Sequence, residues 1–254
     1  VNLSDLAAMG ATPRWATLQI ALPTADDAWL AAFARGLFRM LDAHACELIG
    51  GDTSRADRLA FGLTVFGEVE PGRALMRSGA AANDDIWVSG HIGSAALALA
   101  YRQGRLFMEP IHAAKVLPAL YLPTPRVELG RALLGTASAA IDISDGLCAD
   151  LGHILQRSGL GADLDFTAIP VHDVAHAYLH DPAAIDAILA GGDDYELCFT
   201  APADKRAAVI AAAATTGVPV TRIGTTRAAA GLVVRNAQGD AMPLTRTGYD
   251  HFAS

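Results

Sequence analysis

Residues 139–147 read Ala-Ala-Ile-Asp-Ile-Ser-Asp-Gly-Leu, and this stretch carries the strongest signal for the fold and its chemistry. Residues 139–143 are mostly apolar and predict a short buried strand, whereas the apolar spacing of residues 147–157 predicts a helix. Asp142 and Asp145 lie at the junction between the two. Buried like charges cost free energy unless something neutralises them, so two carboxylates at the end of a core strand favour a bound cation.

The chemistry of this junction allows two interpretations. Oxygen ligands without cysteine or histidine favour Mg²⁺ over Zn²⁺, which predicts a magnesium site. Alternatively, Asp145 caps the following helix and Asp142 bonds to nearby backbone. The residues of this segment leave these two interpretations evenly matched.

Strands and helices also alternate along the rest of the chain. Trp15–Leu22 predicts a strand, and Thr24 with Asp27 resembles a capping box at the start of a helix. Residues 59–65 alternate in a way that predicts a strand with a buried face. Small and polar residues at 78–85 indicate a domain boundary. The pattern predicts a mixed α+β or α/β protein with two lobes.

Composition excludes several classes of protein. The 254 residues include 52% hydrophobic and 18% charged side chains, which is typical of a globular protein. The formal net charge of -8 argues against nucleic acid or an anionic membrane as partner. The three cysteines show no CxxC spacing, which favours a reduced, cytoplasmic compartment with all three buried.

Three further segments place acidic or basic residues beside glycines. Gly50-Gly51-Asp52-Thr53 predicts a glycine-rich turn in which the backbone approaches an anion and Asp52 holds a metal, or simply a capped turn. Asp5 and Arg77 are candidates for metal and phosphate, although taken alone Asp5 is better explained as a surface or capping aspartate and Arg77 as a solvated surface residue. Gly191–Tyr195 suits an ordinary turn or a substrate contact at Asp193.

Together these segments resemble the thiamine-monophosphate kinase family, within the group that includes aminoimidazole ribonucleotide synthetase. The strings that carry the resemblance run in the family's order: Asn2–Ala11, Leu48–Thr53, Arg77–Ala80, Ile141–Leu147, Gly191–Leu197 and Gly248–Phe252. The last three are the most specific to the thiamine enzyme. The resemblance therefore rests on six ordered matches spread over the whole chain.

The resemblance implies a role for each candidate residue. It implies that four carboxylates, Asp5, Asp52, Asp142 and Asp145, ligate Mg²⁺. It also implies that ATP contacts Gly51, Asp52, Arg77 and Ser144. Asp193 and Tyr249 occupy positions at which the family contacts thiamine monophosphate, and Asp193 stands where relatives often carry glutamate. The implied reaction is phosphoryl transfer from ATP to thiamine monophosphate, giving thiamine diphosphate.

The resemblance also implies an architecture. We expect a remainder of an ATP- and metal-binding α/β lobe at residues 1–79, which forms a homodimer through its sheet, and an α+β lobe at residues 80–254. The family's earlier metal-binding segments have no counterpart here, so we expect that the N-terminal lobe is incomplete, and the activity of the chain as given stays open. The alternatives are another ATP-dependent enzyme of the same superfamily, or a nucleotide-binding module without turnover.

Overall fold

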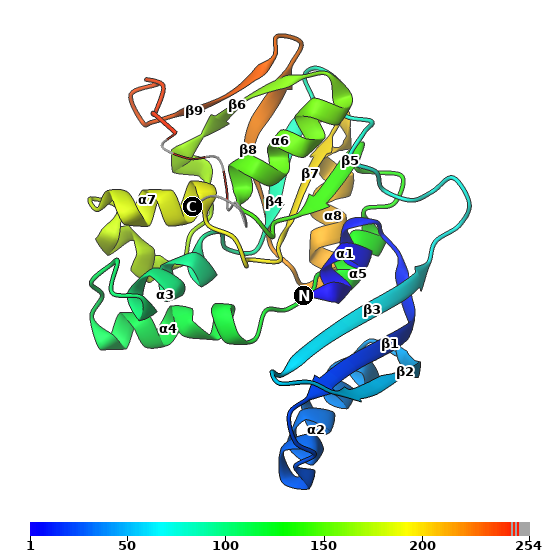
Figure 1. Cartoon of the computed structure of the whole chain (residues 1–254). Helices are drawn as coiled ribbons and strands as arrows, with labels where there is room; N and C mark the ends of the chain where they lie inside the picture. Colours follow the sequence, from blue (N-terminus) through cyan, green and yellow to red (C-terminus); the bar gives the residue numbers. More distant parts are fainter. Residues whose placement is uncertain (245, 247, 249–254) are drawn as a thin grey trace.

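The computed structural model describes residues 1–244, 246 and 248, and their strands form two separate sheets (Figure 1). The smaller sheet has the order β2-β1-β3 and comprises β1 (Thr12–Leu22), β2 (Glu47–Arg55) and β3 (Ala60–Glu68). β1 and β2 are parallel and are connected by helix α2 (Asp27–Ala43), whereas β1 and β3 are antiparallel. The predicted mixed fold is confirmed.

The start of α2 differs from the prediction. Its N-cap is Asp26, whose Oδ1 accepts the backbone N–H of Trp29 at 3.0 Å, so the expected capping box at Thr24 is wrong. A capping side chain bonds the N–H group two or three residues further on. Thr24 lies too early to reach those donors, because the helix begins at Asp27.

The segment Gly50–Thr53 lies inside β2 and is not a turn, which corrects the prediction for this segment. β2 pairs with β1 along its length, with a register shift between Ala16 and Thr17. A Cβ atom at Gly51 would lie 1.9 Å from the carbonyl oxygen of Leu18. Glycine is therefore required here by the close approach of two strands, a role that its place in a glycine pair did not reveal.

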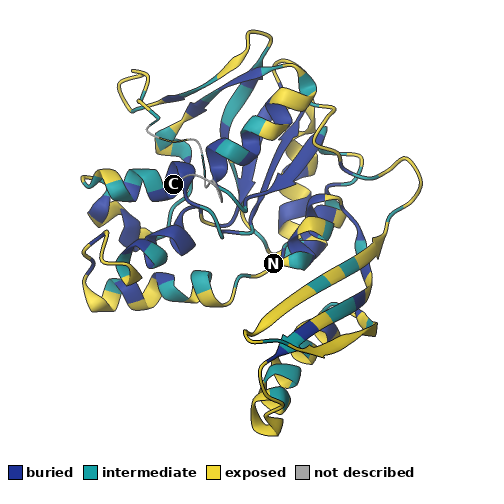
Figure 2. Ribbon diagram, in the orientation of Figure 1, coloured by how far each residue is buried: buried dark blue, intermediate teal, exposed yellow. Residues whose placement is uncertain are grey.

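The smaller sheet buries little apolar surface within this chain (Figure 2). Phe61 and Phe66 on β3 are 59% and 45% exposed, and Leu63 and Val65 are half-buried. The strand predicted at residues 59–65 is thus confirmed, but its buried face is buried only in part. The fully buried cluster beneath α2 is small and consists of Ala16, Leu41 and Cys46.

The larger sheet has the order β5-β7-β4-β8-β6-β9, and its described pairs are antiparallel except for β6 with β9. Its strands are β4 (Asp85–Ser89), β5 (Ala139–Asp142), β6 (Gly161–Asp165), β7 (Leu197–Ala201), β8 (Val220–Arg227) and β9 (Gly231–Arg235). Of these strands, β5 overlaps the strand predicted at residues 139–143. Their order in the sheet, in contrast, follows from pairing between segments far apart in sequence.

Helices cover both faces of the larger sheet (Figure 1). Among the described residues, the α-helices other than α2 are α1 (Asn2–Ala8), α3 (Ser94–Arg102), α4 (Pro110–Tyr121), α5 (Val127–Ala132), α6 (Leu147–Ser158), α7 (Pro182–Ala190) and α8 (Arg206–Thr216). Alternate strand residues face opposite ways. Ile86 and Val88 therefore pack in the cluster that contains α6, whereas Trp87 packs in the cluster that contains α1, α5 and α8.

Helix α1 joins the beginning of the chain to the larger sheet. Leu3 and Ala7 are buried in one cluster with Trp87 and Leu129. A Cβ atom at Gly130 on α5 would lie 1.9 Å from the carbonyl oxygen of Ala7, so the two helices approach closely. This packing brings α1 beside the end of β5.

The three cysteines are buried and free, as the composition predicted. Burial raises the pKa of the Cys148 thiol to about 12. In the part of the chain that the structure describes, no helix combines the length and the apolar character needed to cross a membrane.

Candidate functional site

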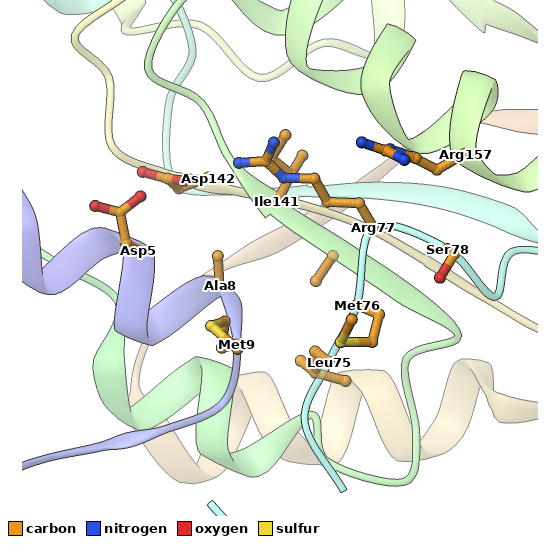
Figure 3. Close-up of a pocket in the computed structure, with 11 residues that line it drawn as sticks. Asp5, Ala8, Met9, Leu75, Met76, Arg77, Ser78, Ile141, Asp142 and Arg157 are labelled. Carbon is orange, nitrogen blue, oxygen red and sulfur yellow. The ribbon is translucent and has the colours of Figure 1, made fainter. Parts of the chain in front are cut away.

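One cavity of about 370 Å³ lies between α1, the end of β5 and the segment around Arg77. Figure 3 shows the carboxylates of Asp5 and Asp142 at one end of this cavity, with the guanidinium of Arg77 extending toward Asp142. Arg157 on α6 lies at the other end, and apolar residues such as Met9 and Ile141 form the walls. We call this space the first cavity. It combines paired carboxylates, two guanidinium groups and apolar surface.

Asp142 is the most constrained of these groups. Burial raises the pKa of Asp142, the nearby Ser4 hydroxyl lowers it, and the neighbouring charges of Asp5 and Arg77 raise and lower it, respectively. Only 5% of Asp142 is exposed, whereas Asp5 is exposed. Two carboxylates whose charges repel one another across a cavity are stabilised by a cation between them.

A second cavity of about 890 Å³ is lined by the loop that follows β5 and by α3 and α7, which contribute mainly alanine side chains. Ser144, Asp145, Asp193 and Tyr195 line it. Basic and amide side chains lie there as well, namely Gln103, Arg105 and Arg246. This second cavity has room for a molecule of several rings and offers groups of both charges.

Two loops that border the second cavity are hydrogen-bonded to each other. The N–H of Asp193 donates to the carbonyl of Ser144 at 3.0 Å, and the N–H of Tyr195 donates to the carbonyl of Ile143 at 2.8 Å. A Cβ atom at Gly192 would lie 2.1 Å from the Ser144 carbonyl oxygen. The glycine therefore permits the contact that joins the loops.

Both cavities are lined by residues of the segment 142–145. Asp142 lines the first cavity and Asp145, three residues later, lines the second. The pKa of Tyr195 is raised, first by burial, then by the charge of Asp193 and its hydrogen bond, and finally by the charges of Asp142 and Asp145. The pKa of this one phenol is thus raised by carboxylates that line both cavities.

Asp150 on α6 organises that loop. Its Oδ2 accepts the N–H groups of Ser144, Asp145 and Gly146, each at 3.0 Å. Burial raises the pKa of Asp150 to about 6, the N–H groups of Asp145 and Gly146 lower it, the charge of Asp145 raises it, and the N–H of Ser144 lowers it. Asp145 does not cap α6 in this structure, whose N-cap is Gly146 without a side-chain hydrogen bond.

The remaining candidates lie apart from these cavities. Gly51 and Asp52 are exposed on β2 in the smaller sheet, and neither lines a described cavity with Asp5, Asp142 or Asp145. Tyr249 lies outside the described residues. The structure therefore brings together Asp5, Asp142 and Arg77 in one cavity, and Ser144, Asp145 and Asp193 in the other.

The donor set fits a hard cation. Among the residues that the structure describes, no group of three or more carboxylate, histidine or cysteine side chains converges as a closed metal cage. Mg²⁺ is commonly held by one or two carboxylates together with substrate phosphates and water. Asp5 and Asp142 supply that number of oxygen ligands in a cavity that Arg77 and Arg157 also line, and arginine side chains suit phosphate groups.

Sequence reasoning missed three residues of the site, Asp150, Arg157 and Tyr195. The position of Asp150 in the first turn of the helix predicted at residues 147–157 was a usable signal, because acidic residues there bond to free N–H groups. Tyr195 lies within the segment singled out at residues 191–195, but no role was predicted for it. Arg157 gives no local signal, since its place in the first cavity depends on how α6 packs on the sheet.

Comparisons with known proteins identify the family of this chain. The model for the AIR synthase related protein, N-terminal domain, matches residues 1–69, and the C-terminal domain model matches residues 70–235. The thiamine-monophosphate kinase of Salmonella typhimurium is 47% identical over 257 residues, which cover 100% of this chain and 78% of that protein.

Two solved structures extend the comparison. The thiamine-monophosphate kinase of Stenotrophomonas maltophilia has a TM-score of 0.86 and 46% identity, covering 95% of this chain and 77% of the other. AaThiL complexed with AMPPCP and TMP has a TM-score of 0.83 and 28% identity, covering 99% of this chain and 77% of the other. Both are similar to this chain over nearly all of its length.

Proposed function

The chain belongs to the thiamine-monophosphate kinase family, and from this premise we propose that it transfers the γ-phosphoryl group of ATP to thiamine monophosphate. The observation that carries the proposal is that the short segment 142–145 lines two cavities, through Asp142 on one side and Ser144 and Asp145 on the other. One cavity has the charges that suit a nucleotide with its metal, and the other has the size that suits a two-ring substrate. A solved relative named with both AMPPCP and TMP supports this pairing.

The reaction needs positioning more than proton transfer. The second pKa of a phosphate monoester is about 6, so the acceptor phosphate is already an anion near neutral pH. The difficulty is the approach of two anions, because two unit charges about 4 Å apart repel by roughly 4 kcal/mol at an effective dielectric constant of about 20. Residues that offset this charge and align the phosphates supply the catalysis.

We propose Asp5, Asp52, Asp142 and Asp145 as ligands of Mg²⁺. These carboxylates would hold the metal, which would supply positive charge to offset the charge of the phosphates. Gly51, Asp52, Arg77 and Ser144 are the proposed ATP contacts. The guanidinium of Arg77 in the first cavity supports its assignment, since arginine recognises phosphate through several N–H donors.

Asp193 and Tyr249 are the proposed contacts of thiamine monophosphate. Asp193 lines the second cavity, where its carboxylate suits the thiazolium cation or the aminopyrimidine of the substrate. An aromatic ring such as that of Tyr249 would hold the same cation by cation–π attraction.

We also propose a cytoplasmic homodimer with a lobe boundary near residues 79 and 80. The exposed Phe61 and Phe66 on the smaller sheet support the dimer, because large apolar side chains exposed on one sheet favour association. Sedimentation at micromolar concentration tests it, and a monomer would contradict it. The smaller sheet lies wholly before the proposed boundary, and the larger sheet lies wholly after it.

The direct test is conversion of thiamine monophosphate to thiamine diphosphate, followed by chromatography with ATP and MgCl₂ present. Product formation that depends on both substrates supports the kinase. Calorimetric ATP binding without ATP consumption would support the nucleotide-binding module. ATP consumption that thiamine monophosphate does not stimulate would favour another enzyme of the superfamily.

A further inference from the structure

We propose that Asp150 is a positioning residue of the kinase site, because its buried carboxylate fixes the backbone that presents Ser144 and Asp145 to the reacting phosphates. This inference rests on the proposed function. Asp150 is 2% exposed and lines neither the first nor the second cavity. Its influence on the reaction must therefore pass through the loop to which it is bonded.

Asp150 accepts hydrogen bonds from backbone N–H groups that lie between a strand and a helix. β5 ends at Asp142 and α6 begins at Leu147, so the N–H groups of residues 144–146 have neither a strand nor a helix to bond to. All three donate to the same oxygen, Oδ2 of Asp150. Consecutive N–H groups that point to one place form a concavity that favours an anion. A carboxylate within the protein occupies it here.

The opposite side of the loop is held as well. The carbonyls of Ile143 and Ser144 accept N–H groups from Tyr195 and Asp193. With donors bound on one side and acceptors on the other, the loop backbone has little freedom. The side chains of Ser144 and Asp145 are left to face the second cavity. Groups held in this way need no reorganisation when ligands bind.

The alternative is that Asp150 contributes to stability alone. A buried donor that loses its acceptor destabilises the folded state, so either role predicts a less stable variant. The roles differ in what happens to the folded protein. A positioning role predicts altered kinetics at saturating substrate, whereas a purely structural role predicts normal kinetics in the molecules that remain folded.

The test compares Asp150→Ala and Asp150→Asn with a matched control, Asp84→Asn. Asp84 is also a buried carboxylate, 3% exposed, that accepts a backbone N–H from Ala81 at 2.9 Å and a hydroxyl from Ser138 at 2.6 Å. It lines neither the first nor the second cavity. Losing it should destabilise the protein without disturbing the loop after β5.

Two measurements are made on each variant. Amide hydrogen exchange of residues 144–146 is followed in protein without nucleotide or metal, and kcat, KM and the half-saturating MgCl₂ concentration are determined by steady-state kinetics. Groups that orient metal ligands typically affect metal affinity or activity by roughly 10–100-fold. We expect Asp150→Ala to accelerate exchange at residues 144–146 and to change kcat or the MgCl₂ midpoint by at least about tenfold.

Asp150→Asn keeps a neutral acceptor and is expected to give a smaller change in the same direction. It also provides the decisive variant should Asp150→Ala fail to fold. Wild-type kinetics for a folded Asp150 variant, or equal kinetic effects in Asp84→Asn, would overturn the inference. Failure of the proposed function is a separate result, since it would appear as an inactive wild type, and the exchange measurement still decides whether Asp150 holds the loop.

Discussion

The phenol hydroxyl of Tyr195 donates a hydrogen bond of 3.0 Å to Oδ1 of Asp193, across the buried Asp194 that separates them in the chain. Both flanking residues have positive φ, 68° at Asp193 and 51° at Tyr195. Such a backbone costs of order 1–3 kcal/mol per residue and persists only where neighbouring contacts determine it. One such contact is made by the carboxylate of Asp194, which accepts the N–H of Gly93 at 2.7 Å.

Removing the phenol hydroxyl should loosen Asp193. In Tyr195→Phe the Oδ1 of Asp193 loses a donor worth about 1 kcal/mol, so we expect the KM for thiamine monophosphate to rise roughly two- to tenfold. Steady-state kinetics measure the change. Tyr121→Phe, on a residue that is 57% exposed on α4, is the control. An unchanged KM would show that Tyr195 does not orient Asp193.

Asp142→Asn tests the metal assignment. The variant removes one of two facing charges in the first cavity while keeping nearly the same shape. Since groups that merely orient metal ligands affect affinity by roughly 10–100-fold, we expect Mg²⁺-dependent nucleotide binding to weaken at least as much. Calorimetry with an ATP analogue and MgCl₂ measures it. Asp204→Asn, on an exposed residue outside the cavities, should bind as wild type. Equal affinity in both variants would rule out the assignment.

Gly130→Ala tests the contact that places Asp5. The added methyl group would lie 1.9 Å from the Ala7 carbonyl oxygen, so α1 and α5 must separate. We expect the free energy of unfolding to fall by about 1–3 kcal/mol, and nucleotide affinity to fall with it. Urea denaturation and calorimetry measure the two effects.

A matched glycine in α6 gives the opposite expectation. Gly152 has no neighbouring atom within 4 Å of an added Cβ. Gly152→Ala should therefore stabilise the protein by up to about 1 kcal/mol through helix propensity. A loss of stability in Gly152→Ala similar to that in Gly130→Ala would count against the steric explanation.

Asp194 predicts a pH dependence of stability. Burial raises its pKa from 3.8 to about 8, the N–H groups of Gly93 and Ala95 lower it, and the charges of Glu196 and Asp193 raise it. Between about pH 4 and pH 8 the folded protein retains a proton that the unfolded chain has released. The free energy of unfolding should therefore fall as pH rises through this range, by at most about 1.4 kcal/mol per pH unit.

Asp194→Asn cannot ionise at this position and should show a shallower decline. Urea denaturation of both proteins between pH 5 and pH 8 measures the two slopes. Parallel slopes would mean that Asp194 does not retain its proton in the folded state.

The sequence pattern predicted several strands and helices of this molecule because short-range interactions along the chain determine them. Apolar runs and three-to-four-residue spacing located β5 and α6, and the acidic residues between them marked the site. The prediction of a turn at Gly50–Thr53 is wrong because a glycine required by a neighbouring strand has the same sequence signature as a glycine required by a turn. The capping box at Thr24 is wrong by two residues for a similar reason, since several polar residues precede that helix.

The sequence by itself determined the family, the sheet-forming segments and the acidic residues at the end of β5. Only the tertiary structure decided that Asp5 lines the same cavity as Asp142, and that Asp150 binds the loop after β5. The physical reason is that periodicity reports which face of an element is apolar. It does not report which distant element that face meets, and this is decided by side-chain packing and backbone hydrogen bonds formed only when the chain is folded.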